Sequence, residues 1–192
     1  MKKLTIILLL FCAPTLVSGC KQHTPKSKEQ SIQPETKKIE ANTPADDEKD
    51  FRAVFKSFQK EVAAKNSKLI QKLMHFPFYT SQQQLQNGEV GSLADPVTAT
   101  EFDQYSKAIY HTEVVKLLPK STEENLSEID DKTTEPYYQS IKKITEPKSK
   151  LYEVYIQYPE SNTQAESYFA FVFGKINGKY KAVAYYAKWP VK

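Results

Sequence analysis

The sequence predicts an α+β domain in which N-terminal helices pack on one face of a curved antiparallel sheet. Apolar residues recur at helical spacing from Phe51 to Val62, whereas residues 152–158 alternate as they do in a half-buried strand. Asn177 and Gly178 lie between two aromatic stretches, and Asn-Gly in that setting is the strongest short signal for a β-hairpin. Helical patterns therefore come first along the chain, and strands follow.

The first twenty residues have the composition of an export signal. Lys2 and Lys3 precede an apolar run from Leu4 to Ala13, which is the charge and hydropathy pattern of a secretory signal peptide. The run is shorter than the roughly 20 residues of a membrane-spanning helix, and Pro14 interrupts it. We therefore expect residues 1–19 to be removed from the mature protein.

The end of this segment resembles the lipobox of bacterial lipoproteins, which it matches with Leu16, Val17, Ser18, Gly19 and Cys20. The resemblance implies that Cys20 receives a diacylglyceryl group and that the chain is cut just before it. Two acyl chains anchor a protein stably, because each buried CH₂ contributes about 0.8 kcal/mol. We therefore expect the membrane as a partner, through the lipid on Cys20.

The same resemblance implies a location in the cell envelope. Position 21 is Lys rather than Asp, so the sorting rule known for enteric lipoproteins predicts the outer membrane, facing the periplasm, in a source with two membranes. In a source with one membrane, we expect the outer face of the cytoplasmic membrane. Cys12 leaves with the signal and Cys20 is lipidated, so no thiol remains for a disulfide.

A linker is predicted at residues 20–48. Residues 21–48 contain no aromatic side chain and include Pro25, Pro34 and Pro44, so they bury too little apolar surface to order. We expect a disordered tether there and a single domain over residues 49–192. Removing the two signal lysines from 27 basic residues leaves 25 against 23 acidic ones, a balance too weak for a dedicated polyanion binder.

Helical spacing predicts the first two helices. Phe51, Val54, Phe55, Phe58 and Val62 share one face of a helix that opens near the acidic residues Asp46 and Asp47. A shorter helix follows Ser67 and must stop near His75, because Pro77 disfavours helical geometry in the residue before it.

The middle of the chain gives weaker patterns. Residues 79–97 are polar and contain Gly88, Gly91 and Pro96, which predicts turns and one short strand. Thr98 and Glu101 form a capping-box pattern for a third helix, whose continuation is bounded by Pro119. Residues 120–150 are rich in charge and turn residues, and no element is predicted there.

The order of these elements resembles the nuclear transport factor 2-like superfamily, also called the cystatin-like α+β fold. The matching features are the helix at 51–62, the short helix ending in a Phe76-Pro77-Phe78 turn, the helix opening at Thr98, and the aromatic hairpin from Tyr168 to Trp189. The resemblance implies a cone-shaped pocket between the sheet and its helices.

Most motifs of catalysis and metal binding are missing. The chain has no nucleophile elbow, phosphate-binding glycine loop, HExxH helix or paired-cysteine pattern, so we expect neither a metal nor a cofactor. Residues 169–172 match the middle of an RNA-recognition strand, but Ser167, Tyr168 and Gly174 replace its basic residue, glycine and final aromatic. We therefore expect a buried strand and no nucleic-acid partner.

Enzymes of the resembled fold, such as ketosteroid isomerases, place an acid or a histidine with tyrosines in the cone. Glu153 interrupts an apolar strand, and tyrosine can present a hydroxyl from an apolar body. The candidate pocket residues are His111, Glu153, Tyr155, Tyr168 and Tyr186. The favoured function is a non-catalytic module that binds a small apolar ligand or an envelope protein, and the alternative is a lyase or isomerase that uses His111 and Glu153.

Overall fold

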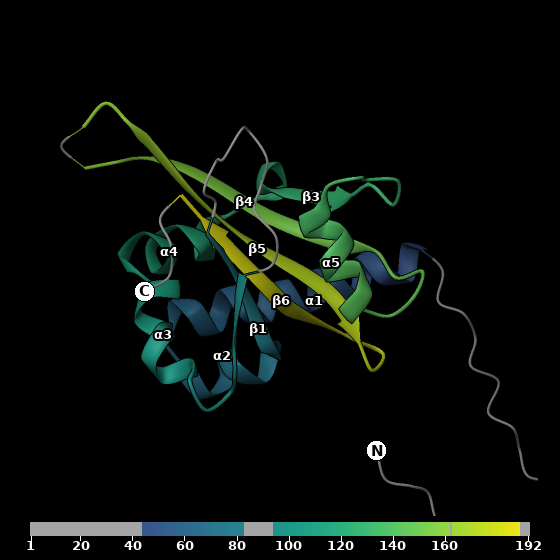
Figure 1. Ribbon diagram of the computed structural model, residues 1–192. Coiled ribbons are helices and arrows are strands. Elements are labelled where there is room, and N and C mark those ends of the chain that lie inside the picture. Colours follow the sequence, from purple (N-terminus) through teal and green to yellow (C-terminus); the bar gives the residue numbers. More distant parts are fainter. Residues whose placement is uncertain (1–43, 83–93, 162, 189–192) are drawn as a thin grey trace, which may run out of the picture. The chain divides into compact units, whose positions relative to one another are not determined.

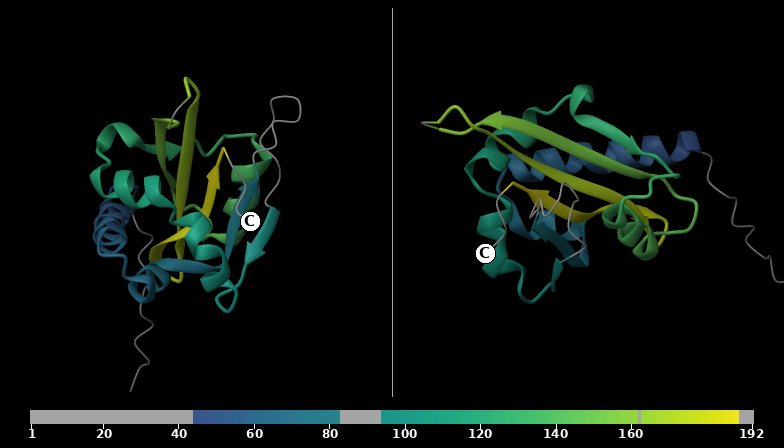
Figure 2. Two further views of the ribbon diagram at one scale, coloured as in Figure 1. Left: turned by 90° about the vertical axis from the view of Figure 1, so that its left-hand side faces the viewer. Right: turned by 45° about the horizontal axis from the view of Figure 1, so that its top comes forward.

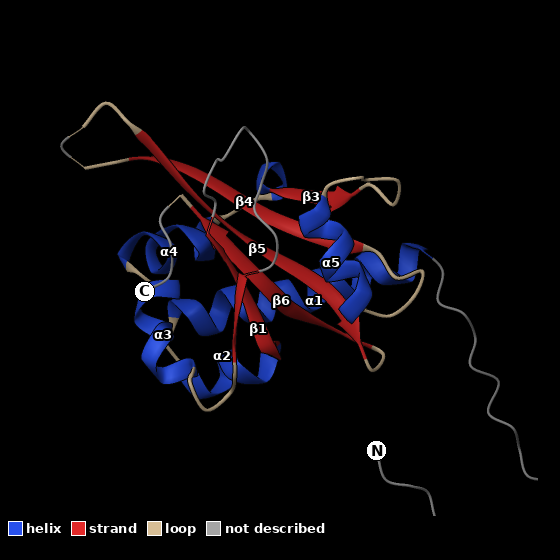
Figure 3. Ribbon diagram, viewed as in Figure 1, coloured by secondary structure: helices blue, strands red, loops and turns tan. Residues whose placement is uncertain are grey.

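The computed structural model describes residues 44–82, 94–161 and 163–188, and these contain five α-helices and a six-stranded sheet (Figure 3). The α+β class predicted from the sequence is thus confirmed. The described residues belong to one unit, Glu40–Lys192. The predicted signal peptide, Cys20, most of the predicted tether and Trp189 lie outside the described residues.

The helices and strands alternate in an irregular order along the chain. They are α1 (Pro44–Ala63), α2 (Ser67–Leu73), β1 (Met74–Gln82), β2 (Ala94–Val97), α3 (Phe102–Ile109), α4 (Thr112–Leu117), β3 (Leu126–Ile129), α5 (Pro136–Ile144), β4 (Leu151–Pro159), β5 (Glu166–Ile176) and β6 (Lys179–Ala187).

The sheet is open and mixed, with the strand order β2-β1-β6-β5-β4-β3 (Figure 1). Four of its pairs are antiparallel, but β1 runs parallel to β6. The predicted all-antiparallel sheet was therefore wrong at this pair. The β5–β6 hairpin is confirmed, because Asn177 and Gly178 have φ values of 49° and 74°, as a type I′ turn requires.

Helix α1 lies along one face of the sheet (Figure 2) and buries the stripe predicted from its helical period. The ring of Phe51 stacks on Tyr152 of β4 with ring centroids 4.3 Å apart. Phe58 packs edge-on against Phe171 and Phe173 of β5 at 5.3 and 5.4 Å. Aromatic side chains therefore fill the face that α1 covers.

Helix α5 covers the opposite face of the sheet, where no helix was predicted. Tyr137 and Ile141 of α5 are buried in a second core together with Val172 of β5 and Ala184 of β6. The prediction that helices pack on one face only was therefore wrong. With apolar residues packed on both sides, residues 169–172 are completely buried, which confirms the expected buried strand.

Strand β1 runs through the segment that was predicted to be a turn at Phe76-Pro77-Phe78. Its pairing with β6 holds at Met74 and again from Tyr79 onward, with a shift of register between them. Pro77 lies inside this irregular stretch, where a strand tolerates a residue without a backbone N–H. A proline that ends a helix therefore does not exclude a strand directly after it.

The third predicted helix is two helices, since α3 ends at Ile109 and α4 begins at Thr112. The side chain of Glu101 accepts hydrogen bonds from the Thr98 backbone N–H (3.1 Å) and from its hydroxyl (2.6 Å). Because α3 begins after Glu101, this pair closes the preceding turn instead of capping the helix as predicted.

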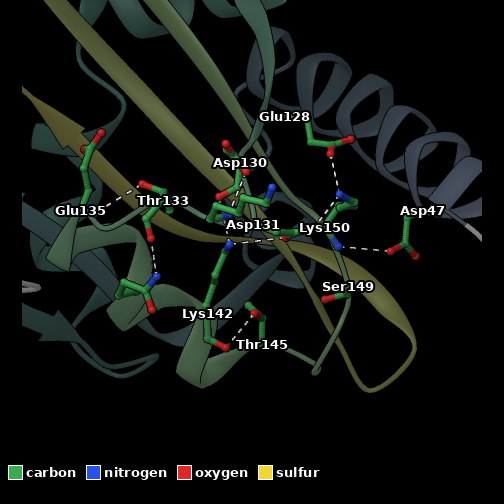
Figure 4. Close-up of polar contacts among 12 residues, drawn as sticks. Asp47, Glu128, Asp130, Asp131, Thr133, Glu135, Lys142, Thr145, Ser149 and Lys150 are labelled. Carbon is green, nitrogen blue, oxygen red and sulfur yellow. Dashed lines mark hydrogen bonds and ion pairs between the residues drawn. The ribbon is translucent and has the colours of Figure 1, made fainter.

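The N-terminus of α1 is fastened to the sheet by charged groups. Helix α1 begins at Pro44, five residues before the predicted start of the domain at residue 49. Asp47 in its first turn pairs with Lys175 of β5 at 2.7 Å, and both side chains are buried. Its other carboxylate oxygen accepts the backbone N–H of Lys150, whose ammonium group pairs with Glu128 and Asp131 (Figure 4).

Candidate functional site

Glu153 is a buried carboxyl group held between two elements. It stands on β4, is only 7% exposed, and accepts hydrogen bonds from the hydroxyls of Tyr138 (2.6 Å) and Tyr186 (2.9 Å). Burial raises the pKa of Glu153, and the two hydroxyl donors oppose that shift. Both hydroxyls donate to Oε1, so protein donors satisfy this oxygen of the buried carboxyl group.

Three of the predicted pocket tyrosines accompany Glu153 on this face of the sheet. Tyr155 stacks on Tyr168 with ring centroids 5.6 Å apart, and Tyr168 meets the edge of Tyr186 at 6.3 Å. Burial raises the pKa of each of the three hydroxyls. At neutral pH they are therefore hydrogen-bond donors and not bases.

Tyr138, which lies on α5 and completes this cluster, was missed from the sequence. No element was predicted at residues 120–150, although the spacing of Tyr137, Ile141 and Ile144 after Pro136 is a helical signal that could have indicated α5. No pattern in the sequence shows that this helix meets β4 at Glu153.

His111 lies on the other face of the sheet. It occupies the junction of α3 and α4, and its ring contacts Phe169 and Tyr158 at centroid distances of 6.0 and 6.4 Å. Burial lowers the pKa of His111 from 6.5, so its ring is neutral at pH 7.

The structure therefore does not bring His111 and Glu153 together. Side chains alternate between the two faces of a strand. Phe169 of β5, which His111 contacts, points to the face under α1 and belongs to the core there. Tyr186, which contacts Glu153, belongs to the core under α5. The β-sheet therefore lies between His111 and Glu153, which a lyase or isomerase would need at the same substrate.

A pocket of about 550 Å³ lies elsewhere, where the ends of four helices meet. Apolar side chains from each helix line it, and they include Val62 of α1, Ile70 of α2, Phe102 of α3 and Val115 of α4. Ser106 and Tyr110 at the same pocket are half-buried, and its other polar side chains are exposed to solvent. None of the five residues predicted for a pocket belongs to it.

In comparisons with known proteins, no protein-family model matches this chain, and no curated protein matches it.

Helical spacing is consistent with apolar residues such as Val62 and Phe102 lying on helix faces, but it does not indicate the gap between the helices. Val62 and Phe102 follow the helical period in the same way as core residues that touch no cavity. The cavity arises because α1, α2, α3 and α4 converge without filling the space between their ends. Such a gap depends on how separate segments pack, which local patterns do not encode.

The described residues hold no cluster of three or more His, Cys, Asp or Glu side chains arranged to bind a metal ion. Within the same residues, no helix combines the length and apolar character needed to cross a bilayer.

Proposed function

We propose that this protein is a lipid-anchored envelope protein whose domain binds a small molecule non-covalently in the pocket between α1, α2, α3 and α4. The observation that carries the proposal is the size and lining of that pocket. Its volume of about 550 Å³ falls within the range of roughly 300–1,000 Å³ typical of ligand sites, and apolar side chains dominate its inner wall.

The anchoring part of the proposal depends on the lipobox. Lipidation at Cys20 would place the domain in the periplasm at the outer membrane of a source with two membranes, or outside the cytoplasmic membrane of a source with one. Cys20→Ala should abolish acylation and release the protein from membranes, because it removes the only thiol of the mature chain. Metabolic labelling with a clickable fatty acid measures this, and label retained by the mutant would contradict the proposal.

We further infer that the domain is a nuclear transport factor 2-like cone. The supporting observations are the long helix α1 across one face of a twisted sheet, the aromatic core between them, and the hairpin of β5 and β6 at the end of the chain. In this domain the space beneath α1 is packed with rings such as Phe58 and Phe171. The proposed ligand site is therefore among the helices and not beneath them.

A lyase or isomerase is not proposed. That alternative depended on His111 and Glu153 acting on one substrate, and their side chains lie on opposite faces of the sheet. Glu153 instead receives two hydrogen bonds inside the second core, where it links β4 to α5 and β6.

Filling the pocket with a large side chain should abolish binding. Ser106 lines the pocket from α3, so Ser106→Trp should place an indole ring in the space that the ligand needs. We expect this variant to lower the affinity for the neutral fluorescent probe N-phenylnaphthylamine by at least about tenfold, equivalent to about 1.4 kcal/mol. Fluorescence titration of the mature chain carrying Cys20→Ala measures the affinity without an attached lipid.

Gln104→Trp is the matched control, because Gln104 is exposed on the same helix and does not line the pocket. Its probe affinity should equal that of the parent chain, and circular dichroism should show both variants folded. The proposal fails if the parent chain does not bind the probe, or if Ser106→Trp binds it as well as Gln104→Trp does.

A further inference from the structure

The pocket between the four helices has a cationic rim. Lys65, Lys107 and Lys116 line it, and all three are exposed to solvent. Lys65 follows the C-terminus of α1, Lys107 lies in the last turn of α3, and Lys116 lies in the last turn of α4. The C-terminal ends of α1, α3 and α4 therefore each place one ammonium group at the same opening.

Little negative charge opposes these lysines. No carboxylate is among the pocket-lining residues of the described chain. Lys116 pairs with Glu113 at 3.2 Å, but neither Lys65 nor Lys107 lies within ion-pair distance of a carboxylate in the part that the structure describes. The opening therefore attracts anions.

The inner wall of the pocket has the opposite character. Val62, Ile70 and Phe102 are buried apolar side chains that present their surface to the cavity. Tyr110 also lines it, but the Tyr110 hydroxyl donates to the sulfur of Met74 at 3.2 Å, so its O–H donor is already occupied. The site thus separates an apolar interior from a positively charged opening.

We propose that the ligand of this pocket is a single-chain amphiphile with an anionic head, a conclusion that rests on the proposed function of ligand binding. The apolar chain lies against Val62, Ile70 and Phe102, and the carboxylate or phosphate head lies between Lys65 and Lys107. A wholly apolar ligand would leave the lysines unused, and a compact anion would leave the apolar wall exposed to water. Charge and hydropathy together select the amphiphile.

The apolar chain of the ligand should supply most of the binding free energy. Lys65 and Lys107 should add a smaller contribution and set the preference for an anionic head group. Exposed ion pairs have small effects, so losing one lysine should weaken binding by at most about fivefold. Replacing Lys65 and Lys107 together should weaken binding of an anionic amphiphile by about tenfold, because the two contributions add when both contact one head group.

The experiment is displacement of N-phenylnaphthylamine from the mature Cys20→Ala chain by ligands of one chain length. Dodecanoate represents a free fatty acid, lauroyl lysophosphatidylglycerol represents a phospholipid head group, and dodecanol is the neutral analogue, all below their micelle-forming concentrations. We expect both anions to displace the probe at lower concentrations than dodecanol does. Whichever of the two anions binds more tightly shows whether the head group comes from a free fatty acid or from a phospholipid.

The double variant Lys65→Gln/Lys107→Gln should lose this preference for anions while binding dodecanol as the parent chain does. Lys68→Gln/Lys72→Gln is the matched control, because both lysines are exposed on α2 and neither lines the pocket. Raising the salt concentration should also reduce the preference in the parent chain, because salt screens exposed charges.

Two outcomes would overturn this inference and leave the proposed function intact. In one, dodecanol displaces the probe as well as the anions do. In the other, the Lys65→Gln/Lys107→Gln variant keeps the anion preference. Failure of the parent chain to bind the probe would instead contradict the proposed function itself.

Discussion

Replacing Lys175 with methionine should lower the free energy of unfolding by about 3–5 kcal/mol. The Lys175 ammonium group lies 2.7 Å from the carboxylate of Asp47, and the two residues are only 4% and 5% exposed. Methionine fills a similar volume but leaves the Asp47 carboxylate buried without its cation. Urea denaturation of the mature chain, followed by circular dichroism, measures the loss.

Lys179→Met is the control for this substitution, because Lys179 is exposed at the start of the next strand. It should change stability by no more than about 0.5 kcal/mol. In the double variant Asp47→Leu/Lys175→Met, part of the loss should be recovered, since an apolar pair often replaces a buried ion pair without penalty, while the backbone N–H of Lys150 loses its acceptor. Equal, small losses for Lys175→Met and Lys179→Met would show that the ion pair does not fix α1 to the sheet.

This ion pair also explains why the ordered domain begins earlier than the residue 49 predicted from the sequence. Residues 44–48 have the composition of the polar linker before them, and only the acidic residues near the helix start indicated a nearby element. Their order depends on Lys175, which lies far away along the chain on β5. A local pattern cannot show that a linker-like aspartate meets a buried lysine.

Local signals predicted the elements that are set by neighbouring residues. The stripe from Phe51 to Val62 is buried as the helical period required, and Asn177-Gly178 forms the expected hairpin turn. Strand β1 and helix α5 were missed for different reasons. Pro77 favoured the prediction of a turn where β1 lies. The charged residues around Tyr137 outweighed the helical spacing of α5, so no helix was predicted there.

The candidate site was predictable only within the strands. Strand alternation and the hairpin register place Glu153, Tyr155, Tyr168 and Tyr186 on one face, and the structure brings these four together. His111 precedes a helix whose position over the sheet is set by long-range packing, and it came to the opposite face. The pocket with Lys65 and Lys107 has the same long-range origin, since each lysine alone resembles any exposed helix residue.

The aromatic core beneath α1 gives the second large effect. Phe58 is completely buried, and its ring packs against Phe171 and Phe173. Phe58→Ala should therefore leave a cavity and lower the free energy of unfolding by about 3–5 kcal/mol. A typical domain has only about 5–15 kcal/mol in total, so a large fraction of the stability depends on this ring.

Lys56→Ala, two residues earlier on the exposed side of α1, should change stability by no more than about 0.5 kcal/mol. The comparison isolates packing, because alanine has the highest intrinsic helix propensity and weakens the helix at neither position. Denaturant unfolding of both variants measures the difference. If Phe58→Ala lowered the free energy of unfolding as little as Lys56→Ala does, α1 would not be packed on the sheet. The arrangement of helices that forms the proposed ligand pocket would then be contradicted.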